Sequence, residues 1–346
     1  MKNRMNILQK SWYQLLVMML LLTSCLEEPT SYPNTYKGNF EALWNIIDTR
    51  YCYLDYKNVN WDSIHTVYAQ QVDTVQNEDQ LFDVLSEMLI ELKDGHVNLS
   101  STFNRSRYWN WFLDYPANFV PELIQSERYL GRHYRISGGL EYEKIEHGTI
   151  GYVYYESFSD PLSNASISAL LSYFDTCKGL IIDVRNNGGG MVTNAELLSS
   201  VFFNQTKKIG YMSHKTGDGH ADFSEPKPMY ANPHESLKWE KPVVVLCNRM
   251  SYSATNIFVN TMRHAPKGLI VGDKTGGGGG LPMANELPIG WSIRYSACPF
   301  YDDQMKHIEW GIDPQVKVDL AVREVSDGFD TLIEEAIKRI KQSTSN

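Results

Sequence analysis

Residues 179–190 read GLIIDVRNNGGG, an apolar run followed by charged, amide and glycine residues. Leu180–Val184 has the composition of a strand buried inside a sheet. The three glycines that follow let the backbone adopt positive φ and approach another group closely. A free amide in this turn could stabilise a developing negative charge. A plain strand-to-helix loop fits the same residues, so the stretch predicts a strand and a turn and leaves the use of the turn open.

Strands and helices alternate along the chain around this segment. Further apolar runs predict strands, and amphipathic stretches between them predict helices. The predicted strands are 150–154, 243–246 and 269–271, and the predicted helices are 165–174, 194–201 and 254–262. Such alternation is typical of an α/β core, and the amphipathic stretch 330–341 predicts a closing helix.

A helical region is expected before this core. Apolar residues at helical spacing predict three helices between residues 38 and 92. Asn77 and Gln80 form a capping-box-like start for the third helix, and Gly95 is expected to stop it. His96 is therefore predicted to lie in a loop directly after a helix.

Ser253 follows the predicted strand 243–246 by a short turn, and a helix is expected to begin beside it. A serine in such a turn projects its hydroxyl into a cleft, and the next amide, that of Ala254, points to where an oxyanion would form. Serine is also a common N-cap residue of helices, and either Ser251 or Ser253 fits that role. A nucleophile and a helix cap are thus both consistent with this segment alone.

Five segments, taken together and in order, resemble those of peptidase family S41, the tail-specific or C-terminal-processing proteases. The segments are Lys93–His96, Gly179–Gly190, Asn248–Ile257, Ile270–Gly279 and Ile308–Val316. The resemblance runs from about residue 39 to residue 318. It implies an α/β core related to the Clp-protease/crotonase spiral of ββα units, preceded by a small helical domain. Only about 50 residues separate Ser101 from Gly151, so no PDZ domain is expected between them.

The resemblance also implies the roles of several residues. Ser253 would be the nucleophile and His96 the general base. The amides of Ala254 and Gly189, with Gly188 as the alternative to Gly189, would hold the oxyanion. Glu309 would orient the histidine.

The base is expected to be histidine because the lysine of the best-studied branch of the family is missing. In this chain the position that corresponds to that lysine falls near Gly278, and Lys274 lies about four residues before it. Because this lysine is missing, the chain resembles the tricorn-like branch of the family, whose base is a histidine. Gly95 stands where that branch has a relay serine, so either Glu309 reaches His96 directly or Asp94 takes its place.

The first residues are typical of an exported lipoprotein. Three basic residues precede the apolar run 15–22, which is too short to span a bilayer. Leu22–Cys25 resembles a bacterial lipobox, which implies cleavage before Cys25 and its acylation. The acidic pair Glu27–Glu28 resembles the surface-export signal of Bacteroidetes lipoproteins. The expected location is the cell envelope, anchored by lipid to a membrane, with the outer membrane favoured and its face undecided.

Composition excludes some partners. Removal of residues 1–24 changes the formal net charge from −9 to −12, and so acidic a protein is not expected to bind nucleic acid. Membrane contact should come from the lipid. Cys52, Cys177, Cys247 and Cys298 show no metal-ligand spacing, and neither a metal nor an organic cofactor is expected.

The sequence thus predicts four regions and one function. The regions are a signal peptide (1–24), a tether (25–37), a helical domain ending in the histidine segment (38–111) and an α/β peptidase core (112–346). The function is exported serine-type hydrolysis of peptides or proteins. A non-catalytic protein that binds an apolar or peptide ligand on the same fold is the alternative. The oligomeric state is left open.

Overall fold

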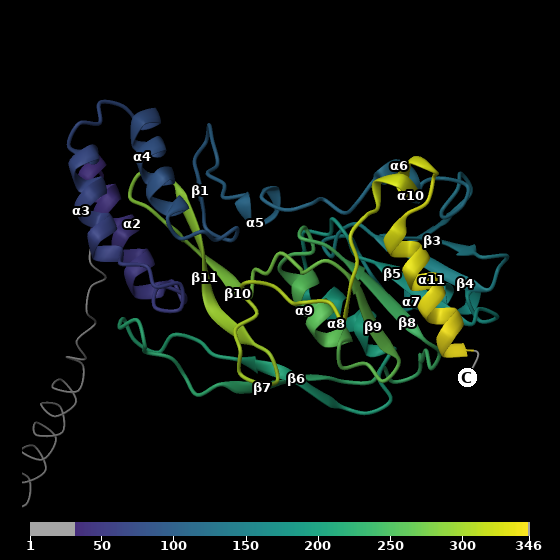
Figure 1. The fold of residues 1–346 in the computed structure, drawn as a ribbon. Helices are drawn as coiled ribbons and strands as arrows, with labels where there is room; N and C mark the ends of the chain where they lie inside the picture. Colours follow the sequence, from purple (N-terminus) through teal and green to yellow (C-terminus); the bar gives the residue numbers. More distant parts are fainter. Residues whose placement is uncertain (1–31, 345–346) are drawn as a thin grey trace, which may run out of the picture.

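A computed structural model describes residues 32–344. The predicted signal peptide, Cys25 and the first part of the tether lie outside these described residues. The helices are α2 (Tyr36–Arg50), α3 (Trp61–Val72), α4 (Glu78–Ile90), α5 (Asn110–Leu113), α6 (Pro121–Ile124), α7 (Asn164–Tyr173), α8 (Val192–Ser200), α9 (Ala254–Met262), α10 (Val322–Ser326) and α11 (Thr331–Thr344). The arrangement in Figure 1 confirms the predicted α/β fold with helices first.

A seven-stranded sheet forms the centre of the larger lobe. Its strand order is β12-β9-β8-β5-β4-β3-β2, with parallel pairing from β12 to β4 and antiparallel pairing from β4 to β2. The strands are β2 (Arg135–Ser137), β3 (Leu140–Ile145), β4 (Ile150–Tyr155), β5 (Gly179–Asp183), β8 (Val243–Cys247), β9 (Gly268–Gly272) and β12 (Val316–Lys317). The opening segment thus supplies β5, between β4 and β8, where both faces are buried.

Helices cover both faces of this sheet. Because side chains alternate along a strand, Leu180 and Ile182 pack with α7, α8 and α9, whereas Ile181 packs with α11 on the other face. The glycine turn and the turn that holds Ser253 follow the carboxyl ends of β5 and β8, which are neighbours in the sheet. Two parallel strands that end at one edge bring the glycine turn and Ser253 together.

A second, antiparallel sheet extends from the N-terminal helices to α8. Its order is β1-β11-β6-β7, and β10 also pairs with β11. The strands are β1 (Asn98–Ser100), β6 (Lys207–Met212), β7 (Lys227–Ala231), β10 (Gly280–Glu286) and β11 (Ser292–Tyr301). Ile293, Tyr295 and Ala297 of β11 share one apolar core with α2, α3 and α4, so the N-terminal helices pack on a strand that comes more than 200 residues later.

The end of α4 differs from the predicted one. The Asn77 side chain caps the start, as predicted, by accepting a hydrogen bond from the Gln80 amide at 2.9 Å. The helix ends at Ile90, however, and Lys93 rather than Gly95 takes the left-handed conformation, with φ of 48°. Gly95 is needed for space instead, because a Cβ there would lie 2.7 Å from Trp111 Nε1 and 2.9 Å from the Tyr252 hydroxyl.

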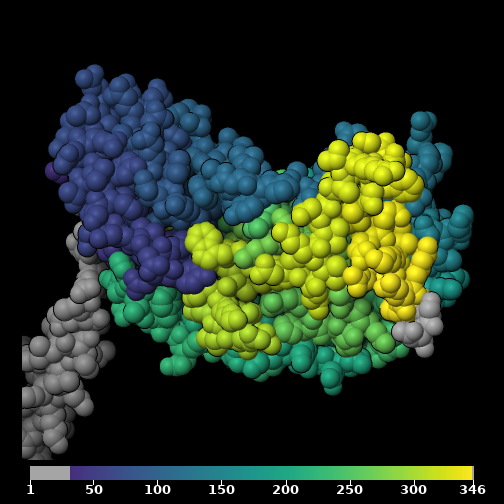
Figure 2. Space-filling view, viewed as in Figure 1, coloured from purple at the N-terminus to yellow at the C-terminus, as the bar shows by residue number. Residues whose placement is uncertain are grey.

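The stretch from β1 to β4 crosses between the lobes without a further domain. Within residues 101–149 the structure places only short helices α5 and α6 and the strands β2 and β3. The space-filling view shows a hollow between the lobe of α2–α4 and that of α10–α11 (Figure 2). No helix among residues 32–344 has the length and apolar character needed to cross a bilayer.

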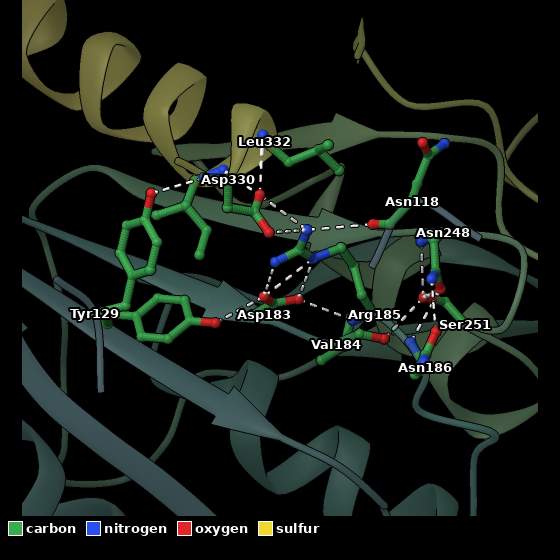
Figure 3. Close-up of polar contacts among 12 residues, drawn as sticks. Asn118, Tyr129, Asp183, Val184, Arg185, Asn186, Asn248, Ser251, Asp330 and Leu332 are labelled. Carbon is green, nitrogen blue, oxygen red and sulfur yellow. Dashed lines mark hydrogen bonds and ion pairs between the residues drawn. The ribbon is translucent and has the colours of Figure 1, made fainter. Parts of the chain in front are cut away.

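A buried ion cluster fixes the turn after β5 (Figure 3). Arg185 is fully buried and pairs with Asp183 at 2.6 Å and with Asp330 at 2.9 Å. Its Nη1 also donates to the Asn118 carbonyl at 3.2 Å. Asp330 precedes α11 and accepts from the amides of that helix's first turn. The cluster therefore ties the start of the glycine turn to the end of the chain.

Candidate active site

Ser253 and His96 meet although 157 residues separate them in the chain. Ser253 Oγ lies 2.9 Å from His96 Nε2, which is within hydrogen-bond distance. Ser253 comes from the turn between β8 and α9, and His96 from the loop between α4 and β1. A hydroxyl in contact with an imidazole is the arrangement in which histidine can take the serine proton.

The backbone at Ser253 is strained in a way typical of a nucleophile turn. Ser253 has φ of 57° and ψ of −119°, and its side chain makes no helix-capping hydrogen bond. Such conformations cost on the order of 1–3 kcal/mol and persist where the surroundings enforce them. Here the Ser253 amide donates to the Gly277 carbonyl at 2.9 Å. The helix-cap interpretation of Ser253 is therefore not the one that the geometry supports.

Ser251, the neighbouring candidate, has a structural position. It is fully buried, its hydroxyl donates to the Val184 carbonyl at 2.8 Å, and it accepts from the Asn248 amide at 3.1 Å. The bond to Val184 joins the turn after β8 to that after β5 (Figure 3). Ser251 thus faces the protein interior while Ser253 faces His96.

Burial keeps the His96 ring neutral. His96 is 3% exposed, and its burial lowers its pKa to about 4 in spite of the nearby Asp94 carboxylate, which raises it. The positive charges of Arg294 and Lys57 lower it further. The imidazole is therefore unprotonated, and able to accept a proton, when the pH is above about 4.

Neither predicted partner of the His96 ring, Glu309 or Asp94, makes a hydrogen bond to it. The Gly280 backbone, which raises the His96 pKa, is a polar group beside the ring instead. Asp94 Oδ1 accepts instead from the His96 backbone amide at 2.8 Å, so it fixes the loop rather than the ring. Glu309 accepts from the Gly279 amide at 2.8 Å and pairs with Lys57. The Tyr252 ring packs edge-on against the imidazole at 5.0 Å and is its aromatic support.

Lys57 is a site residue that sequence reasoning missed. Its ammonium lies 2.6 Å from Glu309 Oε1 and 3.4 Å from Asp94 Oδ2, and its side chain is 3% exposed. Burial lowers the Lys57 pKa, but the two carboxylates raise it by more. One cation balances two acids, so burial and the neighbouring Asp94 raise the pKa of Glu309 to about 7, while Lys57 helps to lower that of Asp94 to about 2.

The amides available to an oxyanion differ in part from the predicted pair. The Ala254 amide, first in α9, donates to no described acceptor, and a helix N-terminus favours negative charge. The Gly189 amide, in contrast, donates to Asn187 Oδ1 at 3.0 Å. The Gly188 amide, the predicted alternative, has no acceptor among the described residues. Gly189 is required for close approach, since a Cβ there would lie 2.8 Å from Ser253 Cβ and 3.0 Å from the Ala254 nitrogen.

Lys274 lies away from this pair. Its ammonium is 3.9 Å from Asp313, and it lines a different cavity from Ser253. Gly278, near which the lysine of the best-studied branch would fall, has φ of 73°, and a Cβ there would lie 2.4 Å from the Tyr252 ring. Asn256 is buried and bridges α9 to other segments through the Ile308 carbonyl and the Thr275 hydroxyl.

The Ser253 and His96 side chains open into a cleft of about 830 Å³. Its lining includes the glycine turn, the start of β10 and the aromatic rings of Trp109, Trp111 and Tyr252. Trp111 stacks on Tyr252 with ring centroids 4.1 Å apart. The volume of the cleft falls in the usual range for ligand pockets. Because the cleft is open to solvent, it can admit an extended peptide chain.

Comparisons with known proteins show what this chain resembles in sequence and fold. Residues 149–318 match the model described as peptidase family S41, and residues 32–90 match the Tricorn protease C1 domain. A candidate peptidase of Parabacteroides merdae with a crystal structure is 46% identical, with a TM-score of 0.84 over 89% of this chain and 97% of that one. The structure of mature CPAF, 12% identical with a TM-score of 0.65 over 88% and 96% of the two chains, shares the fold.

A curated relative is similar over a shorter region. The carboxy-terminal processing protease CtpA of Bacillus subtilis (strain 168) is 28% identical over 182 residues. The match covers 52% of this chain and 37% of that relative. The chain therefore spans little more than a third of the length of this protein.

Proposed function

Because the chain belongs to peptidase family S41, we propose that it is a serine peptidase that uses Ser253 as nucleophile and His96 as general base. The observation that carries the proposal is the 2.9 Å contact between Ser253 Oγ and His96 Nε2. The neutral state of the buried imidazole supports the same role. A lysine base is not favoured, because Lys274 pairs with Asp313 and the backbone at Gly278 leaves no space for a side chain.

The geometry supports acyl transfer in two steps. In the first, His96 Nε2 takes the Ser253 proton while Oγ attacks the substrate carbonyl, and the same proton then passes to the leaving amine. The Ala254 amide, with that of Gly188, would hold the oxygen that becomes negative. In the second step, water attacks the acyl-enzyme with His96 again as base, which frees Ser253 and the new carboxyl end of the substrate.

Lys57 is a positioning residue in this scheme. It touches neither Ser253 nor His96, but it fixes Asp94, which holds the His96 backbone, and Glu309, which holds Gly279. Gly278 and Gly280, on either side of Gly279, line the cleft. The buried cation therefore supports both the loop of the base and the opposite wall.

We expect His96→Ala to lower kcat for peptide hydrolysis by at least about 10³-fold, because Ser253 loses its proton acceptor. The matched variant Lys274→Ala removes only a loose contact with Asp313 at 3.9 Å and should retain wild-type kcat. Steady-state kinetics on a quenched fluorescent peptide compare the two. Lost turnover in Lys274→Ala together with an active His96→Ala protein would show that the base is misassigned.

We further propose that the mature protein begins at acylated Cys25 and is held at a membrane of the cell envelope by that lipid. The lipobox-like quartet Leu22–Cys25 after a short apolar run supports this. Several acyl chains on one cysteine suffice for stable anchoring. Intact-mass and peptide mass spectrometry of the native protein should find a lipid-modified Cys25 at the N-terminus. An unmodified Cys25, or cleavage at another bond, would contradict the proposal.

A further inference from the structure

One wall of the cleft around Ser253 is cationic. Arg105, Arg107 and Arg294 all line it, and the lining contains no aspartate, glutamate or lysine. The chain has 41 acidic and 32 basic residues, so a cleft with three arginines and no acid departs from the composition of the molecule. A concentration of positive charge in a cleft raises the local concentration of anionic ligands.

These three arginines have no carboxylate partner among the described residues. Arginines elsewhere do, as in the pairs of Arg128 with Glu334 at 2.8 Å and Arg249 with Asp273 at 3.1 Å. The Arg105 guanidinium donates to a single described acceptor, the Asn98 amide oxygen, at 3.1 Å. Arg107 lies over the Trp109 ring at 5.3 Å. The bidentate donors that arginine offers to a carboxylate are therefore available on this wall.

Strand pairing holds two of the guanidinium groups near each other. Asn98 of β1 is paired with Arg294 of β11, and the same Asn98 accepts from Arg105. Arg294 is half-buried and makes no side-chain hydrogen bond to a described residue, and burial together with the charge of Arg105 lowers its pKa. Two like charges so placed repel each other, and an anion between them would remove this repulsion.

We propose that this wall binds side-chain carboxylates of the substrate, so that the enzyme prefers acidic peptides; the inference rests on the proposed peptidase function. Three arginines exceed what a single carboxylate can engage bidentately, which favours a segment with more than one acidic side chain over one free C-terminus. The cleft also exposes the apolar side chains of Met191 and Leu281. A substrate with acidic residues next to apolar ones would contact both the arginine wall and these apolar side chains.

The test compares matched peptides on the full mature chain. A peptide that the protein cleaves is made with Glu, Gln or Lys at the positions flanking the scissile bond. Each is N-terminally acetylated and is made in two forms, with an amidated and with a free C-terminus. We expect kcat/KM for the Glu peptide to exceed that for the Gln peptide about tenfold, mainly through KM, with the Lys peptide the poorest. The preference should shrink at 1 M salt, where exposed charges are screened.

Variants assign this preference to the cleft. Arg294→Gln and Arg105→Gln should each bring the Glu-to-Gln ratio toward one, and Arg294→Glu should favour the Lys peptide. Arg132→Gln is the matched control, because Arg132 is exposed and pairs only loosely with Glu127 at 3.8 Å. It should leave the ratio unchanged. Thermal melting shows whether each variant is folded.

The outcomes separate this inference from the function it rests on. Equal cleavage of the Glu, Gln and Lys peptides would overturn the acidic preference and leave the peptidase function intact. Cleavage that needs a free C-terminus and ignores the side chains would assign the wall to the terminal carboxylate instead, which also overturns the proposal. Failure to cleave any peptide, with no fluorophosphonate adduct on Ser253, would refute both.

Discussion

Replacement of Ser253 by alanine is expected to lower kcat for peptide hydrolysis by about 10⁶-fold. The substitution removes the atom that attacks the carbonyl and that lies 2.9 Å from His96 Nε2. It removes no capping bond, since the Ser253 side chain caps nothing. The strained backbone, with φ of 57°, is kept by alanine. Stability in urea should therefore stay within about 1 kcal/mol of the wild type, as for substitutions that remove no packing.

Ser251→Ala is the matched control, with the opposite pattern. Its hydroxyl bonds to the Val184 carbonyl and the Asn248 amide in the interior, so its loss should cost about 1–3 kcal/mol of unfolding free energy. Activity of the folded protein should stay within about tenfold of the wild type, because no reacting atom is lost. Labelling with a fluorophosphonate and peptide mapping provides a second readout. An adduct on Ser251, or an active Ser253→Ala protein, would refute the assignment.

Replacement of Arg185 by methionine should cost about 3–5 kcal/mol of unfolding free energy, because two buried carboxylates lose their counter-ion. Asp183 and Asp330 are fully buried, and Arg185 binds both at 2.6 Å and 2.9 Å. Activity should fall as well, since the turn that begins at Asn186 positions Gly189 beside Ser253. Urea unfolding followed by fluorescence and circular dichroism measures the change.

Arg128→Met is the matched control for this loss. Arg128 makes an equally short pair with Glu334, at 2.8 Å, but its side chain is 39% exposed, so water screens the interaction. It should cost no more than about 1 kcal/mol. If Arg185→Met and Arg128→Met had the same small effect, the buried cluster would not stabilise the fold as we infer.

The sequence predicted the local structure around the site. The segments of Gly189 and Ser253 each contain a strand, a turn and a helix start in succession, and these patterns are readable within a few residues. The buried β5 and the helical N-terminal region were predictable for the same reason. Two parallel strands ending at one edge then bring the segments together. The roles of Ser253, Ala254 and Gly189 were implied by the family resemblance alone and remain predictions.

The contacts around His96 could not be predicted in this way. Lys57 lies in the loop after α2, among residues with no catalytic pattern, and only the packing of that loop against the 309 segment brings its ammonium to Glu309. Because a lysine is normally exposed, nothing local marked Lys57 as a buried residue. The orientation of Glu309 depended on this unseen cation, so its predicted contact with His96 was wrong. The acceptor of the Gly189 amide likewise depended on one rotamer of Asn187.

The Arg185 cluster determines when, during synthesis, the cleft can reach its final form. Asp330 lies 145 residues after Arg185, and α11 must cover its face of the sheet before that carboxylate is in place. His96, Ser253 and Glu309 likewise come from widely separated parts of the chain. A ribosome-bound chain that stops short of Asp330 holds Ser253, His96 and Glu309, but Arg185 then has Asp183 alone and the link from the glycine turn to α11 is missing. We therefore expect the Ser253–His96 site to reach its final form late, once the last helix is made, rather than when Ser253 itself appears.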